Sequence, residues 1–433
     1  MQAVIKPKTG FKKTTIGEIP EEWKIANLKD VCTKITDGVH KTPKYQDQGI
    51  PFISVNNIAT GKLDFSDCKY ISYKDHQELI RRCFPHKGDI LLGKVGTLGV
   101  ADIVNVDFEF SIFVQIALLE TDKNKIVPQY LKYILNSTEL QKAIQMNASG
   151  TTLKYIGLNT ISKLKVPLQS ITEQQKIACI LSKVDQLIQK TDQIIEQTER
   201  LKKGLMQRLL TKGIGHTKFK NVKLYNDTIT IPEQWTLVKL RDYTTKIGSG
   251  VTPTGGSQVY VQKGIPLIRS QNVHFDGLKL DDVAYITQAI HNEMKNTKLQ
   301  DNDVLLNITG ASLGRCTFVP PNFGEGNVNQ HVCIIRPKTD LNAIFLSYFL
   351  SSYHGQKMIL RSLNGLSREG LTFKEIGSFS VAAPTLQEQK KIVTVMNSVQ
   401  SKMQKVLSQK SNFEKLKKGL MQKLLTGKIR VKV

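Results

Sequence analysis

The chain has 433 residues, 40% of them hydrophobic, so it can form two or three domains that each bury a core. Lys and Arg number 61 against 37 Asp and Glu, which gives a formal net charge of +24 and a sequence pI near 9.6. This composition excludes a disordered chain and favours a polyanionic partner, above all nucleic acid, although a basic surface on an anionic membrane would give the same total.

Neither membrane insertion nor export is expected. The longest apolar stretch, residues 108–119, is interrupted by Glu109, Ser111 and Gln115 and is too short to span a bilayer, so it is predicted to be a buried strand. The N-terminal residues lack the apolar segment of a secretory signal. The six cysteines form no CxxC pair, which indicates reduced thiols in a cytoplasmic protein.

Sequence landmarks recur in the same order in both halves of the chain. The matching segments are IPEEW (19–23) with IPEQW (231–235), GIPFISVNNI (49–58) with GIPLIRSQNV (264–273), YLKYILNS (130–137) with FLSYFLSS (345–352), and residues 150–177 with 365–392. This recurrence indicates that the fold is built twice, so that the chain can present two similar surfaces to one extended partner.

Each half begins with a region of short strands. The segments that start at Lys87 and Asp301 are rich in β-branched residues and are broken by Gly, Asn and Asp, as is typical of strands joined by tight turns. Helical patterns follow at 130–145 and 345–360. Each half is therefore predicted to contain a mixed α/β globular region.

A long helix is predicted to follow each globular region. Ser170 with Glu173, and Thr385 with Glu388, form S/T-x-x-E capping boxes at equivalent positions. Apolar residues then recur at coiled-coil spacing, interrupted by Thr191, Thr198 and Lys410. The predicted pairing residues are Ile177, Leu181, Val184, Ile188, Ile195 and Leu205 in the first helix, and Ile392, Val395, Val399, Met403, Val406, Phe413, Leu420 and Leu424 in the second.

A narrow apolar seam requires a partner, and the simplest partner for each helix is the other one. The string LKKGLMQ occurs in both helices, at 201–207 and 416–422. Its glycines, Gly204 and Gly419, should each cost about 1 kcal/mol relative to Ala. Two explanations remain open at this stage: close approach of another chain, and a simple helix break or cap.

No catalytic motif is evident. Residues 88–94 fit GxxxxGK, but Val95 follows in place of Ser or Thr, and the intervening Ile-Leu-Leu favours a strand; Asn307 and Ile308 replace the Gly and Lys in the second half. The eight histidines, among them His40, His76, His86, His274 and His331, show no metal-ligand spacing and do not match between the halves. GxSxG elbows and S-adenosylmethionine loops are also missing, so we expect no catalysis by the chain alone.

Together, the repeated IPExW opening, the GIPxI segment, the GDILL-like strand and the EQxKI helix entry resemble the specificity subunit of type I restriction–modification enzymes. The resemblance covers residues 16–426. It implies two target recognition domains that each read one half of a bipartite site in double-stranded DNA. It also implies paired helices that dock two modification (methyltransferase) subunits, with separate restriction/translocase subunits. S-adenosylmethionine, ATP and Mg2+ are expected on those partners, and none on this chain.

The expected fold is α+β, with two mixed α/β domains alternating with two long helices that pair as an antiparallel coiled coil. The expected boundaries are 1–168 for the first recognition domain, 169–213 for the central helix, 214–383 for the second recognition domain and 384–433 for the C-terminal helix. Antiparallel pairing would place the domains far enough apart to address grooves about one helical turn, roughly 34 to 36 Å, from each other.

Base readout requires side chains that form paired hydrogen bonds with base edges, and Arg, Lys, Asn and Gln are the main ones. Polar loop residues meet this need, although each could instead cap a turn or remain solvated. The candidates are Lys41, Thr42, Lys44, Asn56, Asn57, Lys94, Thr97 and Lys154 in the first half, and Thr252, Thr254, Arg269, Gln271, Asn272, Asn307, Thr309, Arg315 and Arg368 in the second. The Asn-Gln pair common in the family is found only in the second half, as Asn329 and Gln330.

Two other hypotheses remain. A coiled-coil adaptor could bind proteins through its globular regions, with the basic charge as a solvated surface. An enzyme could carry an active site whose residues are not adjacent in sequence.

Overall fold

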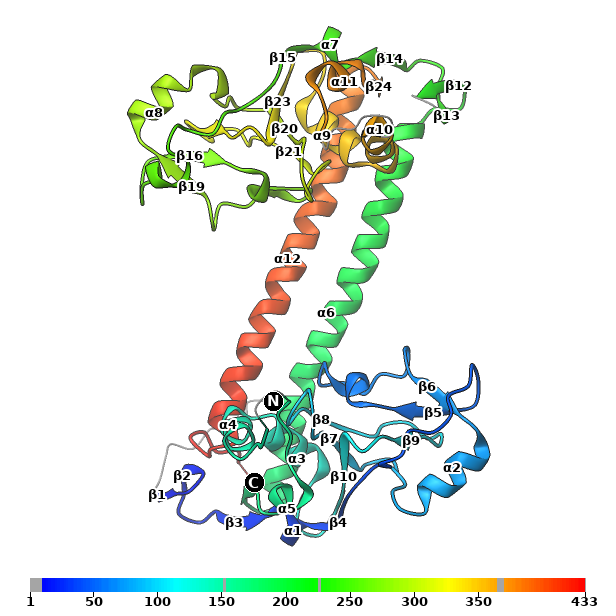
Figure 1. Ribbon diagram of the computed structural model, residues 1–433, viewed down its shortest axis with the longest axis vertical. Helices are drawn as coiled ribbons and strands as arrows, with labels where there is room; N and C mark the ends of the chain where they lie inside the picture. The colour runs from blue at the N-terminus through cyan, green and yellow to red at the C-terminus, as the bar shows by residue number, and fades with distance from the viewer. Residues whose placement is uncertain (1–9, 151–152, 225–226, 364–369, 433) are drawn as a thin grey trace. The chain divides into compact units, whose positions relative to one another are not determined.

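The computed structural model describes residues 10–150, 153–224, 227–363 and 370–432 (Figure 1). The chain forms two compact units. The first unit comprises Met1–Asp192 and Gln409–Val433, and the second comprises Gln193–Ser408. Two long helices, α6 (Ile171–Lys212) and α12 (Leu386–Leu424), each contribute one end to each unit.

The centre of the first unit is a four-stranded antiparallel sheet. Its strands lie in the order β4 (Cys32–Asp37), β10 (Ile116–Thr121), β7 (Ile90–Gly93) and β8 (Ala101–Ile103). Successive side chains of a strand point to opposite faces, so Leu92 of β7 packs into one core while Leu91 packs into another. The sheet therefore separates two cores, and its central strands β7 and β10 are largely buried on both faces, whereas β4 at the edge is partly exposed.

The smaller core lies under a three-stranded sheet of β6 (Lys69–Ile71), β5 (Ile50–Ile53) and β9 (Ser111–Ile112), next to η1 (Val55–Ile58) and α2 (Tyr73–Ile80). The prediction of one buried strand over residues 108–119 is wrong. A turn, in which the Ile116 amide donates to the Phe113 carbonyl at 3.0 Å, separates β9 from β10, and the two strands belong to different sheets.

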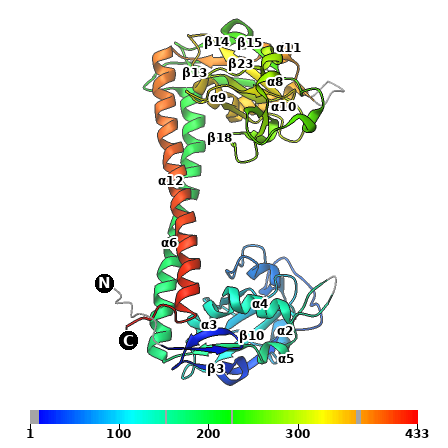
Figure 2. The same ribbon diagram turned by 90° about the vertical axis from the view of Figure 1, so that its left-hand side faces the viewer.

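Helices cover the larger core (Figure 2). The helix predicted over 130–145 is divided at Ser137, whose hydroxyl caps the second part by accepting from the Leu140 amide at 3.3 Å. The remaining elements of this unit are β1 (Phe11–Thr14), β2 (Gly17–Pro20), β3 (Lys24–Asn27), α1 (Leu28–Val31), α3 (Pro128–Leu135), α4 (Thr138–Met146), α5 (Leu158–Ser162) and β11 (Lys165–Leu168).

The second unit repeats this plan with one additional hairpin. Its four-stranded sheet has the order β15 (Thr244–Ser249), β23 (Val332–Pro337), β20 (Val304–Asn307) and β21 (Cys316–Phe318), and its three-stranded sheet has the order β19 (Ala284–Ile286), β16 (Ile265–Ile268) and β22 (Asn327–Val328). The other strands are β12 (Phe219–Leu224), β13 (Asp227–Pro232), β14 (Thr236–Lys239), β17 (Val273–His274), β18 (Gly277–Leu278) and β24 (Ser380–Ala383).

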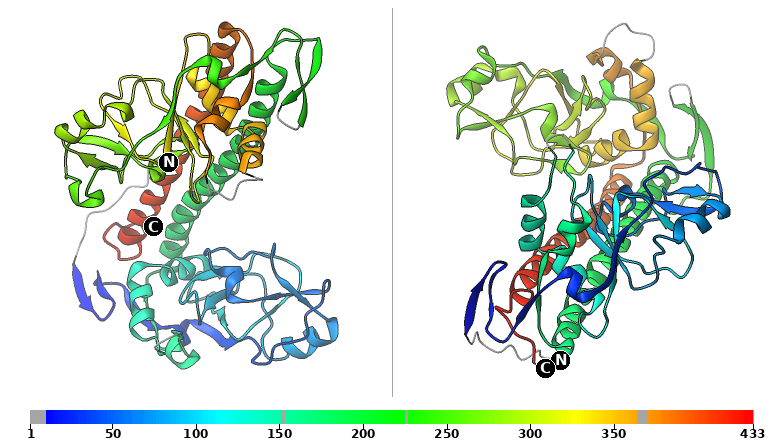
Figure 3. Two further views of the ribbon diagram at one scale, coloured as in Figure 1. Left: turned by 45° about the horizontal axis from the view of Figure 1, so that its top comes forward. Right: turned by 60° about the horizontal axis from the view of Figure 1, so that its bottom comes forward.

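Short helices complete the second unit. They are α7 (Leu240–Tyr243), η2 (Gly256–Val259), η3 (Ser270–Asn272), α8 (Gln288–Glu293), η4 (Lys295–Thr297), α9 (Ala343–Ser351), α10 (Tyr353–Leu363) and α11 (Phe373–Ser378). The helix predicted over 345–360 is likewise divided, at Ser352. Leu209 and Leu210 of α6 and Ile392 of α12 pack into the main core of this unit. Figure 3 shows the strands and short helices of this unit, in green to orange, from two further directions.

The long helices run antiparallel where they meet inside each unit. In the first unit, Lys417 of α12 pairs with Asp185 of α6 at 2.6 Å, and Lys410 pairs with Asp192 at 2.6 Å. In the second unit, Lys202 of α6 donates to the Gln400 amide oxygen at 2.6 Å. The helix positions therefore advance in opposite directions, which confirms the predicted fold class.

The predicted seam is buried to different degrees along its length. Ile177, Leu181, Val184, Ile392, Val399, Met403, Val406 and Leu424 are buried, whereas Ile188, Ile195, Leu205, Val395, Phe413 and Leu420 are partly buried. Thr191 and Thr198, expected as interruptions, are buried in the seam because their hydroxyls donate to the Leu187 and Ile194 carbonyls at 2.7 Å.

The capping boxes form only in part. The Glu173 and Glu388 amides donate to the Ser170 and Thr385 hydroxyls at 3.2 and 3.4 Å. The glutamate carboxylates bind elsewhere: Glu173 pairs with Arg430, and Glu388 accepts from the Ile214 amide at 3.0 Å.

Candidate nucleic-acid interface

A polar hollow opens in the second unit where strands β16, β20 and β22 end. It has a volume of about 800 Å³ and is lined by Ser270, Gln271, Thr309, Gly310, Ala311, Ser312, Arg315, His331 and Gly370. The same hollow is therefore lined by three of the residues predicted to contact DNA: Gln271, Thr309 and Arg315. Its polar side chains come from three chain segments, at 270–271, 309–315 and 331, and include donors and acceptors of the kinds that bond base edges.

Hydrogen bonds fix two of the groups at this hollow. The Gln271 side-chain amide donates to the exposed Asp282 carboxylate at 2.5 Å, and the Thr309 hydroxyl lies 2.6 Å from His331 Nδ1. The Arg269 guanidinium donates to the Asp282 carbonyl at 3.0 Å and lies 5.8 Å from the Tyr260 ring centroid. His331 and Ser312 are not among the predicted contact residues, because a single His or Ser in a loop carries no pattern.

Several other candidates have structural roles that occupy their polar groups. Asn57 and Asn272 are buried at matching positions: each oxygen accepts from the backbone amide three residues earlier at 3.0 Å, and each amide donates to two carbonyls further on. Asn307 is fully buried and donates to the Ser270 carbonyl and the Ser312 hydroxyl at 2.8 and 3.0 Å. These amides hold the loops in place and are not open to a base.

Lys94 is buried in the first unit and its ammonium forms a short ion pair with Asp37. Arg82 binds the other oxygen of the same carboxylate at 2.6 Å. Burial opposes ionisation of Asp37, but the hydrogen bonds from Lys94 and Arg82 outweigh it and hold the pKa of the carboxyl below its ordinary value. Lys94 therefore serves the fold, and its segment forms strand β7 as the Ile-Leu-Leu run predicted.

The remaining candidates lie at the surface or outside the described residues. Lys41, Thr42, Lys44, Asn56, Lys154, Thr252 and Thr254 are exposed, and Thr97 is partly buried. Thr252 donates to the Gln330 side-chain oxygen, which brings one residue of the Asn-Gln pair to the same loop. Arg368 lies outside the described residues.

The LKKGLMQ strings line matching grooves in the two units. Lys418, Met421 and Gln422 face the corner between α3 and α4 in a groove of about 380 Å³. Lys203, Met206 and Gln207 face the corner between α9 and α10 in a groove of about 440 Å³. A Cβ added to Gly204 or Gly419 would meet no atom within 4 Å, and both helices continue through these glycines. Neither a break nor close approach within the described chain explains them.

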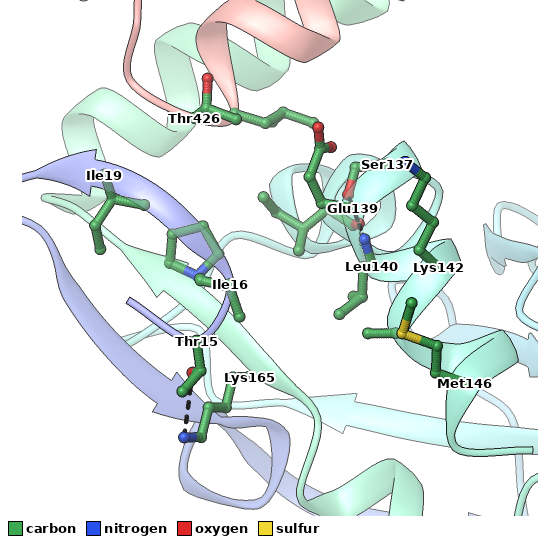
Figure 4. Close-up of a pocket in the computed structure, with 14 residues that line it drawn as sticks. Thr15, Ile16, Ile19, Ser137, Glu139, Leu140, Lys142, Met146, Lys165 and Thr426 are labelled. Atoms are coloured by element: carbon green, nitrogen blue, oxygen red, sulfur yellow. Dashed lines mark hydrogen bonds between the residues drawn. The ribbon is translucent and has the colours of Figure 1, made fainter. Parts of the chain in front are cut away.

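A more apolar pocket of about 200 Å³ occurs in the first unit (Figure 4). Ile16, from the turn between β1 and β2, faces Leu140 and Met146 of α4, and Lys165 closes one side by donating to Thr15 at 3.3 Å. Met146 is 83% exposed. In the second unit, Asp227 of the matching hairpin instead forms ion pairs with Lys357 and Arg361 of α10, each at 2.7 Å.

Other chemistry has little support. No group of three or more His, Cys, Asp or Glu that could hold a metal ion is found within the described ranges. Burial raises the pKa of the Cys316 and Cys333 thiols to about 12, so neither is a thiolate near neutral pH. None of the described helices is both long and apolar enough to cross a membrane.

Comparison with known proteins identifies the repeat. A family model described as "Type I restriction modification DNA specificity domain" matches residues 20–200 and again 232–412. A putative type I restriction enzyme specificity subunit (MjaX) of Methanocaldococcus jannaschii is 30% identical over 429 residues, which cover 98% of this chain and 97% of that protein. The MjaVIII specificity subunit of the same organism is 26% identical, over 98% of this chain and 96% of that protein.

A solved structure gives the same fold. The S subunit of a type I restriction–modification system from M. genitalium superposes with a TM-score of 0.60 at 16% identity, over 96% of this chain and 98% of that one.

Proposed function

We propose a DNA-reading role for the hollow of the second unit and the matching loops of the first, on the premise that this chain belongs to the type I restriction modification DNA specificity family and is a non-catalytic specificity subunit. Each unit would read one half of a bipartite site in double-stranded DNA. The observation that carries this proposal is the convergence of Gln271, Thr309 and Arg315 on one open concavity in a chain of net charge +24.

The chemistry of these side chains suits base edges. A glutamine amide can bond adenine at two positions and an arginine guanidinium can do the same with guanine, each worth about 1–3 kcal/mol of discrimination. In the first unit we retain the exposed residues Lys41, Thr42, Lys44, Asn56 and Lys154, together with Thr97. We omit Lys94, Asn57, Asn272 and Asn307, because each side chain is buried and its nitrogen donates within the fold.

The two LKKGLMQ grooves are our proposed docking sites for two copies of the modification subunit. An identical string at two surface positions suits two identical partners, and the open glycines leave room for a partner helix. Restriction/translocase subunits would join this assembly in the cytoplasm. S-adenosylmethionine, ATP and Mg2+ would bind those partners.

The test begins with the target sequence. Mapping methylated sites in the host genome before and after deletion of this chain gives both half-sites and their gap. Binding of that DNA by the assembled modification complex is then measured for Gln271→Ala and Arg315→Met. We expect each variant to weaken binding roughly 5- to 150-fold, corresponding to about 1–3 kcal/mol, and to relax specificity in one half-site.

Arg241→Met is the matched control, because Arg241 is exposed on α7 in the same unit and does not line the hollow. Equal losses of DNA affinity for the Arg241 and Arg315 variants would mean that Arg315 acts only through its positive charge and that the hollow does not read bases. Binding that ignores sequence, or no binding, would favour the adaptor hypothesis. Methyl transfer by the purified chain alone would favour a concealed active site.

Salt provides an independent check. Neutralising six to ten phosphates should lower affinity by on the order of 10³ to 10⁵ between 50 and 200 mM salt. An affinity that is flat across this range would contradict the role given to the positive charge.

A further inference from the structure

A buried histidine occupies the same place in both units. His76 of α2 is 0% exposed and His291 of α8 is 2% exposed. The two positions differ by the same offset as the LKKGLMQ strings, so the expectation that the histidines do not match between the halves is wrong for this pair.

Each imidazole bridges its helix to the strand that follows an exposed glutamate. His76 Nδ1 lies 2.9 Å from the Ser111 hydroxyl of β9, and its Nε2 lies 3.2 Å from Glu109. His291 Nδ1 lies 2.5 Å from the Asn327 side-chain oxygen of β22, and its Nε2 lies 3.3 Å from Glu325. The one chemical difference is therefore Ser111 against Asn327.

The orientation of the Asn327 amide follows from its neighbours. Its nitrogen lies 3.1 Å from the Met294 carbonyl and 2.6 Å from the Thr297 hydroxyl. The Thr297 hydroxyl already donates to the Met294 carbonyl at 3.0 Å, so it can only accept from Asn327. The Asn327 oxygen must then face His291, where it can only accept.

Both ring nitrogens of His291 thus face acceptors, an amide oxygen and a carboxylate, and both bonds form only if both nitrogens carry protons. His76 has no such requirement. A hydroxyl can donate or accept, so Ser111 can donate to Nδ1 while Nε2–H donates to Glu109.

We propose that His291 is held as an imidazolium that fastens α8 to β22, and that His76 fastens α2 to β9 as a neutral imidazole. If it loses one proton, His291 can keep only one of its two bonds, because a bare ring nitrogen cannot donate to an acceptor. The second unit therefore carries a proton-dependent fastening and the first carries a proton-independent one.

The charges around His291 favour this assignment. Of the Asp and Glu side chains that the structure describes, Glu325 is the one within 4.0 Å of its ring nitrogens. On and after its own helix, Glu293 and Lys295 are exposed, and the Lys298 ammonium lies 3.4 Å from the Asn292 oxygen. The elements packed beside it, β16 and β19, contribute apolar side chains and Tyr285.

His291 becomes a positioning residue for DNA reading if the proposed function holds. Strand β22 pairs in parallel with β16, with Leu267 opposite Asn327. The chain runs from β16 to Gln271 and from β22 to His331, and both residues line the hollow. Loss of one hydrogen bond at His291 would therefore make the loops that carry Gln271 and His331 less well ordered.

The primary test uses the full chain with selectively ¹⁵N-labelled histidine and no DNA, so its outcome is independent of the proposed function. Spectra of His291→Gln and His76→Gln assign the two rings. At pH 7 we expect two protonated nitrogens in His291, and one protonated and one bare nitrogen in His76. A neutral His291, or two rings of the same charge, would overturn the proposal.

The swap variants Asn327→Ser and Ser111→Asn provide the second readout. Hydrogen-exchange protection of α8 in the wild type should fall about tenfold from pH 6.5 to 8.5 relative to α2, equivalent to the loss of one hydrogen bond. Asn327→Ser should abolish this fall, and Ser111→Asn should create one in α2. If Asn327→Ser fails to fold, the Ser111→Asn arm decides alone; an α2 without pH dependence there would refute the assignment.

Discussion

The two units have the same buried glutamine side chain at the start of each long helix. They differ in the residues at the ends of two strands of the four-stranded sheet. Gln174 and Gln389 make the same three backbone hydrogen bonds, to residues that also match between the units. By contrast, strand pairing places Ile308 where the first unit has Lys94, and Ser249 where it has Asp37. The two units thus differ at these two positions and agree at the glutamines that support the entry of each long helix.

The largest expected effect comes from breaking the ion pair that only the first unit has. Asp37→Ser leaves the Lys94 ammonium buried with no carboxylate, which should destabilise the first unit by about 3–5 kcal/mol. The double variant Asp37→Ser with Lys94→Ile copies the second unit and should recover most of this loss, because an apolar replacement of a buried pair is often neutral. Hydrogen exchange followed by mass spectrometry measures each unit separately.

In the same experiment, Ser249→Ala is the control and should change the second unit by less than about 1 kcal/mol. A double variant as unstable as Asp37→Ser alone would mean that the Ser and Ile of the second unit cannot replace the ion pair in the first.

Lowering the pH should also destabilise the first unit more than the second, by less than the Asp37→Ser substitution does. The pKa of folded Asp37 lies below its unfolded value, so the stability it contributes is present above the unfolded value and is lost as pH falls through the folded one. We expect the first unit to lose protection below about pH 4, and Asp37→Asn to remove that dependence. Identical acid profiles for wild type and variant would show that other carboxylates control acid unfolding.

Because Gln174 and Gln389 make matching hydrogen bonds, we expect their replacement to destabilise the two units equally. Gln174→Ala and Gln389→Ala each remove a buried side-chain amide and leave one backbone amide and two backbone carbonyls without that partner, which should cost about 1–3 kcal/mol, each in its own unit. The measurement is the free energy of local opening by hydrogen exchange. A large difference between the two variants would contradict the equivalence drawn from their matching bonds.

Most of the architecture was predictable because the same sequence patterns occur in both halves of the chain. The helices, their antiparallel pairing and the mixed α/β units follow from matching patterns. The residues proposed to read DNA were less predictable, because an asparagine that holds a buried turn looks in sequence like one that could bind a base. Asn57 and Asn272 match between the halves, and that match indicates a frame residue, since reading residues should differ.

Lys94 was misleading in the opposite way. It differs between the halves, as a reading residue should, but its partner Asp37 is 57 positions away and differs with it. Only the fold brings the two together. The split of residues 108–119 into two sheets likewise depends on tertiary pairing and not on local pattern.

The smallest expected effect concerns the glycines of the LKKGLMQ strings. With open space at Cβ, Gly204→Ala and Gly419→Ala should each stabilise the free chain by about 1 kcal/mol. Gly204→Leu and Gly419→Leu should leave the free chain folded but weaken binding of the modification subunit, measured by titration calorimetry. Destabilisation by Ala would show that the glycines serve the helices themselves, and unchanged binding by the Leu variants would move the docking site elsewhere.

The first unit is completed by residues that come after the whole of the second. Leu424, Leu425 and Val431 belong to its main core, and Arg430 binds Glu173 at 2.7 Å and lies 5.6 Å from the Trp23 ring centroid. During synthesis, a ribosome therefore finishes residues 193–408 before it supplies the segment that closes the earlier unit. Until then the first core lacks Leu424, Leu425 and Val431, so a chain truncated near residue 408 should contain all of the second unit and an incomplete first one.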